Sequence, residues 1–175
     1  MRIFSAFSIC VVCIFAMTFS GCNVIKPATP DLNKGFSCTA DITYDGLNVT
    51  AQINRIDNGK WEVKLLSPTS LKDITLTYSA GDMTIGYKGL TFNLPENSLP
   101  VQAITNNIVN AFDNAAQGIG IEVERSDDNT KMTGKINDIT YTILVAPDDT
   151  VIGLSIPDIK LEATFDGFSF ADVLP

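Results

Sequence analysis

The sequence predicts a mainly β domain with some α: a strongly curved antiparallel sheet, an incomplete β-barrel of about eleven strands, with one principal amphipathic helix on its concave face. Two observations predict this fold. Apolar and polar residues alternate in short runs, and a single stretch of helical spacing divides six runs from five. No crossover helix separates successive runs, so neighbouring strands are expected to be antiparallel.

Alternation begins at Phe36, where Phe36, Cys38 and Ala40 share one phase and polar residues occupy the other. A period of two is typical of a half-buried strand. The pair Asp45-Gly46 that follows is typical of a tight hairpin turn. Five further inward-facing sets precede the helix: Leu47, Val49, Ala51 and Ile53; Trp61, Val63 and Leu65; Ile74, Leu76 and Tyr78; Met83, Ile85 and Tyr87; and Leu90, Phe92 and Leu94.

The period changes over residues 99–117. Apolar residues there recur at spacings of three and four, which is typical of one face of an amphipathic helix: Val101, Ile104, Ile108, Phe112 and Ala115. Ser98 is the expected N-cap, Pro100 suits the first turn, and Gly118 suits the C-terminal stop.

After the helix, alternation resumes in runs separated by acidic, Gly or Asn turns. The runs lie at residues 119–123, 132–136, 141–145, 152–156 and 161–165, and a last edge segment is expected at 167–172. One domain is therefore expected over residues 36–175. Residues 22–35 contain two prolines and little apolar periodicity, so they are expected to form a tether.

Residues 1–21 have the order of a signal peptide. One positive residue, Arg2, precedes an uncharged apolar stretch at 3–19, and the small residues Ser20 and Gly21 follow. The alternative is an uncleaved transmembrane anchor, for which this stretch is only marginally long.

The four residues Phe19-Ser20-Gly21-Cys22 resemble the lipobox of bacterial lipoproteins, in which an aliphatic and two small residues precede a cysteine. Phe19 replaces the usual leucine. The resemblance implies cleavage before Cys22 and lipid attached to its sulfur. Two or more acyl chains give a stable anchor. The expected location is extracytoplasmic, on the cell membrane or on an outer membrane if the host has one.

Composition excludes several classes of function. The chain carries 12 basic and 20 acidic residues, a formal net charge of −8. An anionic membrane repels such a chain, so membrane contact is expected through the lipid on Cys22. Nucleic acid is not expected as a partner, because its binding needs clustered Lys and Arg. The chain has no histidine, which removes Ser-His and Cys-His catalytic arrangements and the commonest zinc ligand. We therefore expect that the chain is not an enzyme and that it binds no metal and no cofactor.

Other candidate sites have simpler interpretations. Cys38 is the single cysteine left after Cys22 and the signal peptide, and its inward phase predicts a buried, unreactive thiol. Glu122 and Glu124 alternate with apolar residues, which favours a solvated strand face over a calcium site. Asp148-Asp149 is typical of a hairpin turn.

Three stretches between residue 36 and about residue 118 together carry a family resemblance: GKWEVKL at 59–65, SPTSL at 67–71 and YKGL at 87–90, followed by the helix. This combination resembles the LolA/LolB-like superfamily of lipoprotein carriers, whose members form an incomplete β-barrel covered by helices. The resemblance implies a non-enzymatic protein that holds acyl chains or acts as a docking module. Members usually have a helix before the first strand, for which residues 31–35 are too few. Carriers also use an inward arginine, to which no residue of this chain is matched.

The predicted sheet has more inward apolar positions than one helix covers, because a single helix shields a stripe only about 100° wide. Either the sheet packs against itself, or a cavity remains for an acyl chain, a lipid, a lipidated partner or another apolar ligand. The expected lining of that cavity is Trp61, Val63, Tyr78, Ile85, Phe92, Ile104, Ile108 and Phe112. The alternative is an ordinary core in a docking or structural module that supports an envelope protein without a ligand.

Overall fold

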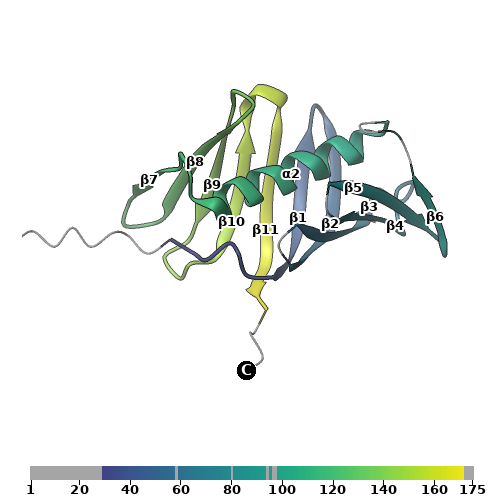
Figure 1. Ribbon diagram of the computed structural model, residues 1–175, viewed down its shortest axis with the longest axis horizontal. Coiled ribbons are helices and arrows are strands. Elements are labelled where there is room, and N and C mark those ends of the chain that lie inside the picture. The colour runs from purple at the N-terminus through teal and green to yellow at the C-terminus, as the bar shows by residue number, and fades with distance from the viewer. Residues whose placement is uncertain (1–28, 58, 80, 94, 96–97, 172–175) are drawn as a thin grey trace, which may run out of the picture.

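The computed structural model describes residues 29–57, 59–79, 81–93, 95 and 98–171 (Figure 1). The predicted signal peptide, Cys22 and the first part of the tether lie outside these residues, so their processing stays a prediction. Within the described ranges, no helix has the length and hydrophobicity needed to cross a membrane.

Eleven strands form one antiparallel sheet, in the order β6-β5-β4-β3-β2-β1-β11-β10-β9-β8-β7. Strands β6 and β7 are its two edges, so the sheet stays open, as predicted for an incomplete barrel (Figure 1). The strands are β1 (Phe36–Tyr44), β2 (Leu47–Asp57), β3 (Lys60–Ser67), β4 (Ile74–Ser79), β5 (Asp82–Tyr87), β6 (Leu90–Asn93), β7 (Glu122–Arg125), β8 (Thr130–Ile136), β9 (Ile139–Val145), β10 (Val151–Ile156) and β11 (Leu161–Phe170). The 3₁₀ helix η1 (Pro157–Ile159) connects the last two.

The sheet consists of two meanders that meet in its middle. Strands β1 to β6 pair in sequence order, and so do β7 to β11. Strand β1 then pairs with β11, in a register that sets Phe36 opposite Phe170 and Tyr44 opposite Leu161. The predicted edge segment at 167–172 is therefore wrong, because residues 167–170 continue β11 at the centre of the sheet.

Helix α2 (Pro100–Gln117) joins the two edges and crosses the sheet on the face that carries the core (Figure 1). Pro100 occupies its first turn, and Gly118 ends it in the left-handed conformation with φ of 67°, both as predicted. The predicted N-cap at Ser98 is wrong. Leu99 holds that position, because the Ser98 hydroxyl donates to the Pro95 carbonyl at 2.5 Å, while the Leu99 N–H donates to the Gln102 side chain at 2.9 Å.

The predicted strand at 119–123 begins later than expected. Two glycines with positive φ, Gly118 and Gly120, turn the chain after the helix, and Ile119 between them is 76% exposed. Strand β7 therefore starts only at Glu122.

The core lies between the sheet, α2 and a short N-terminal segment. Inward residues of β1, β2 and β3 are buried in the predicted phase, with burial alternating along each strand. Leu32, which precedes the first strand, is only 2% exposed. The folded unit thus includes part of the segment that the sequence assigns to the tether.

Candidate functional site

Six of the eight predicted lining residues are buried together between sheet and helix. Trp61 and Phe112 have no exposed surface, and the other four are at most 5% exposed: Val63, Ile85, Ile104 and Ile108. Tyr78 is half-buried against this core. Phe92 stands apart on β6, where it is 46% exposed.

Aromatic rings fill the centre of this region. Trp61 of β3 lies 5.4 Å from Phe36 and 5.9 Å from Phe112 of α2, measured between ring centroids. Phe112 also lies 5.7 Å from Phe165 of β11. These edge-on contacts join three strands to the helix. The space predicted as a cavity is thus filled by the protein's own side chains in this structure.

A buried arginine lies at the edge of the aromatic cluster. Arg55 is 2% exposed, and its Nη2 is 2.9 Å from the Asp113 carboxylate of α2. Its Nη1 donates to the carbonyls of Leu32 and, at 3.4 Å, Lys34. The guanidinium also lies 5.4 Å from the centre of the Trp61 ring. Arg55 therefore ties together the sheet, the helix and the N-terminal segment.

Sequence reasoning missed Arg55, although a signal was present. Strand β2 places Val49, Ala51 and Ile53 inward, and Arg55 continues that phase by two residues. A charged residue in an apolar phase at a strand end is usually assigned to solvent, because burying a lone charge is unfavourable. Its compensation by Asp113 depends on tertiary contact between elements far apart in the sequence.

A second polar contact joins the helix to the other half of the sheet. Tyr141 of β9 is fully buried, and its hydroxyl donates to the Asn114 side chain at 2.7 Å. Burial raises the pKa of Tyr141 from 10.0 to about 12, so the phenol stays protonated, and a donor, well above neutral pH. The N-terminal segment is fixed as well, since Asn33 donates to the Ala116 carbonyl at 3.1 Å.

The remaining candidates match their simpler interpretations. Cys38 is 4% exposed, and burial raises the pKa of its thiol to about 12, as expected for an unreactive cysteine. Glu122 and Glu124 are exposed on β7, and Asp148 and Asp149 lie in a turn. Over the described ranges, no three His, Cys, Asp or Glu side chains are gathered as a metal site would need.

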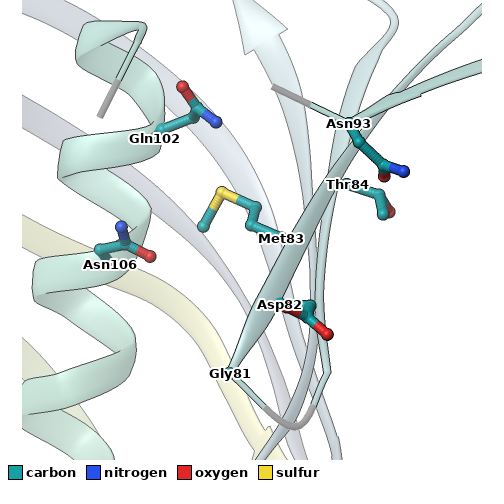
Figure 2. Close-up of a pocket in the computed structure, with 7 residues that line it drawn as sticks. All are labelled: Gly81, Asp82, Met83, Thr84, Asn93, Gln102 and Asn106. Carbon is teal, nitrogen blue, oxygen red and sulfur yellow. The ribbon is translucent and has the colours of Figure 1, made fainter. Parts of the chain in front are cut away.

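An open pocket of about 440 Å³ lies beside the first half of α2. Its lining comes from the β5 hairpin, β6 and the helix: Gly81, Asp82, Met83, Thr84, Asn93, Gln102 and Asn106. Figure 2 shows the Met83 side chain pointing from the strand toward the helix, between Gln102 and Asn106. We call the contact between α2 and the core-bearing face of the sheet the seam. The pocket thus lies at the β5–β6 end of this seam.

Comparisons with known proteins bear on the fold. The sequence matches no protein-family model, and it matches no curated protein. Among solved structures, an uncharacterized conserved protein from Thermus thermophilus is similar at 9% identity and a TM-score of 0.51, over 82% of this chain and 83% of that one. A LolA superfamily protein from Nitrosomonas europaea (11% identity) and a DUF1329 family protein from Desulfovibrio piger (9%) each align over 82% of this chain and 88% of their own. Their TM-scores of 0.42 carry no argument, so what is shown is the fold shared with the Thermus protein.

Proposed function

We propose that this chain is a non-catalytic envelope lipoprotein that binds an acyl chain or similar apolar ligand between the concave face of its sheet and α2. The observation that carries the proposal is that one helix covers an apolar sheet face. Its apolar stripe contains Ile104, Ile108 and Phe112, each at most 3% exposed. If the helix moves aside, the surface that it leaves is suited to a ligand with the same apolar character.

The energy of such an exchange is within reach of an acyl chain. Burying one methylene contributes about 0.8 kcal/mol, so about ten methylenes contribute about 8 kcal/mol. When the helix leaves the sheet, its own buried apolar residues, such as Phe112 and Ile108, become exposed, and this opposes ligand binding. A chain-length dependence of affinity is therefore expected, with short acyl chains unable to displace the helix.

The polar groups in the seam favour a ligand that also carries a hydrogen-bond acceptor. Among the described residues, the buried indole N–H of Trp61 has no hydrogen-bond partner. An unsatisfied buried donor is unfavourable by about 1–3 kcal/mol. A carbonyl or carboxylate oxygen placed beside Trp61 would accept this hydrogen bond and would lie near Arg55, whose guanidinium is 5.4 Å from the ring.

The test is binding of a fluorescent fatty-acid probe to the mature chain without its lipid, residues 23–175, combined with native mass spectrometry of the chain purified from its host. Saturable one-site binding and a co-purifying lipid are expected. Asp113→Asn loosens the helix and should increase probe affinity. Ile119→Ser is the matched control, since Ile119 is exposed outside the seam. A mass without ligand, together with no saturable fluorescence change, contradicts the proposal.

A second candidate is a docking module that supports an envelope protein without a ligand. The observation that favours it is the filled interior around Trp61 and Phe112, both without exposed surface. Affinity purification of the tagged lipoprotein distinguishes the two. One stoichiometric protein partner with no lipid indicates docking, whereas bound lipid without a partner indicates carriage.

A further inference from the structure

The two edges of the sheet differ in how they are protected. An edge strand exposes unpaired backbone groups, and proteins commonly guard such edges with charge, proline or a bulge. Strand β7 carries three charged residues, Glu122, Glu124 and Arg125, all exposed. Strand β6 has the sequence LTFN, with no charge and no proline, and it pairs with β5 without a register shift. Among the described residues, no strand pairs with its outer side, so β6 can pair with a further strand.

Strand β6 is also apolar on one face. Leu90 is 61% exposed and Phe92 46%. Their partners on β5 are Tyr87 and Ile85, and Ile85 is 5% exposed in the core. Because opposite residues in an antiparallel pair lie on the same face, Leu90 and Phe92 continue the core-bearing face beyond the part that the helix covers.

We propose that β6 pairs antiparallel with β6 of a second copy of this chain, centred on Thr91. Side chains alternate between the two faces of a strand, and opposite residues must share a face. When β6 pairs with its own copy, opposite residues must therefore both have even numbers or both have odd numbers. Centring on Thr91 satisfies this rule. It sets Leu90 of each copy against Phe92 of the other, so both exposed apolar side chains of each copy find an apolar partner.

The charge distribution favours this edge for contact between copies. Residues 60–93 carry four basic and three acidic residues, whereas residues 113–171 carry four basic and eleven acidic ones. Pairing through β6 brings the nearly neutral ends together and keeps the strongly acidic ends apart. Pairing through β7 would instead oppose Glu122 and Glu124 of two copies, and like charges across a strand pair are destabilising.

The position of the N-terminal segment is compatible with two anchored copies. Thr29, where the described N-terminal segment begins, lines a pocket with Gly118 and Val123 at the β7 end of the molecule, far from β6 (Figure 1). A two-fold axis normal to the sheet places both N-terminal segments at the outer ends. A four-residue strand buries less surface than a standard interface. Confinement to one membrane raises the effective concentration that such a contact needs.

The test is disulfide cross-linking of full-length Thr91→Cys in the host membrane under mild oxidation. Directly opposite strand residues lie about 4.5 or 5.5 Å apart between Cα atoms, within the range that a disulfide spans. We expect most of the Thr91→Cys chain to migrate as a dimer that reductant reverses. Glu124→Cys, at the other edge, measures random collision and should give only a minor dimer band. The native Cys38 is buried and gives the wild-type baseline.

Two further variants test the register and the apolar contact. Co-expressed Leu90→Cys and Phe92→Cys chains should cross-link with each other more than either does with itself. Adding Leu90→Lys to Thr91→Cys should abolish the dimer, whereas adding Ile119→Lys, at an exposed apolar position away from β6, should not. Circular dichroism of each variant verifies folding. Equal cross-linking of Thr91→Cys and Glu124→Cys overturns the proposal, whatever ligand the seam binds.

Discussion

Arg55 is a charged side chain in the core, and among the described residues the Asp113 carboxylate forms an ion pair with it. Asp113, 2.9 Å away and 22% exposed, supplies the compensating charge. Removing one partner of a buried pair leaves the other charge uncompensated, which destabilises proteins by about 3–5 kcal/mol. The two carbonyls that Arg55 also contacts do not carry a full charge, so they do not replace Asp113.

We predict that Asp113→Asn, which keeps the size of the side chain, lowers the free energy of unfolding by about 3 kcal/mol in urea denaturation at pH 7. The matched control is Asp45→Asn. Asp45 pairs with Lys160 at 2.7 Å, but both side chains are more than half exposed, so little change is expected. Equal effects of the two substitutions would show that the buried pair has no special role.

Two buried weak acids predict how stability responds to alkaline pH. Burial raises the pKa of Cys38 from 9.0, and that of Tyr141 from 10.0, to about 12 in each case. Below pH 9 both groups are protonated in the folded and unfolded chain. Above it the unfolded chain releases protons that the folded chain retains, so the free energy of unfolding falls as pH rises toward 12. Cys38→Ala should flatten this slope between pH 9 and 11 when urea denaturation is measured at each pH. An unchanged slope would contradict the assignment to Cys38.

The Tyr141 side chain of β9 lies across Gly134 of β8. Gly134 of β8 is paired with Tyr141 of β9. A Cβ atom at Gly134 would meet the Tyr141 ring and hydroxyl, and would lie 2.8 Å from Ile121 Cδ1. The absence of a side chain at this position therefore lets the Tyr141 hydroxyl reach Asn114 of the helix.

We predict that Gly134→Ala destabilises the domain by about 1–3 kcal/mol, because overpacking forces neighbouring side chains from their preferred positions. Gly153→Ala in β10 is the control, since the nearest atom to its Cβ would be the Ala163 carbonyl oxygen at 3.4 Å, an ordinary contact. Thermal unfolding of both variants measures the difference. A larger loss in Gly153→Ala would show that Tyr141 moves aside without penalty.

At the scale of the whole molecule, the proposed lipid anchor on Cys22 holds the domain at a membrane. We predict that Cys22→Ala abolishes metabolic labelling with a fatty-acid probe, and that the chain stays a full-length precursor or is released from the membrane. The reason is that the lipid is expected to be attached through a thioether to the sulfur of Cys22. Without that sulfur the lipid cannot be attached, and the chain has no anchor. Cys38→Ala, which alters the buried thiol, should leave labelling unchanged. Labelling that survives Cys22→Ala would exclude the lipobox interpretation.

Much of the architecture follows from periodicity because strands and helices impose it locally. A period of two identified the inward faces of β1, β2 and β3, and spacings of three and four identified α2. Predictions failed where the same local pattern is compatible with two different arrangements of the chain. Ser98 and Gln102 both carry groups able to satisfy the first turn of the helix, and residues 167–170 alternate equally well at an edge or in the centre.

The sequence by itself determined the strand phases, the helix and the exclusion of histidine chemistry, since each depends on residue type and spacing along the chain. Only the tertiary structure decided what covers each inward face. Helix α2 covers Trp61, which is fully buried, but it leaves Phe92 exposed at the sheet edge, although both residues share the inward phase. It also brings Asp113 to Arg55, which makes an inward arginine tolerable. Periodicity assigns a face to a side chain, but coverage and charge compensation depend on contacts between segments distant in sequence.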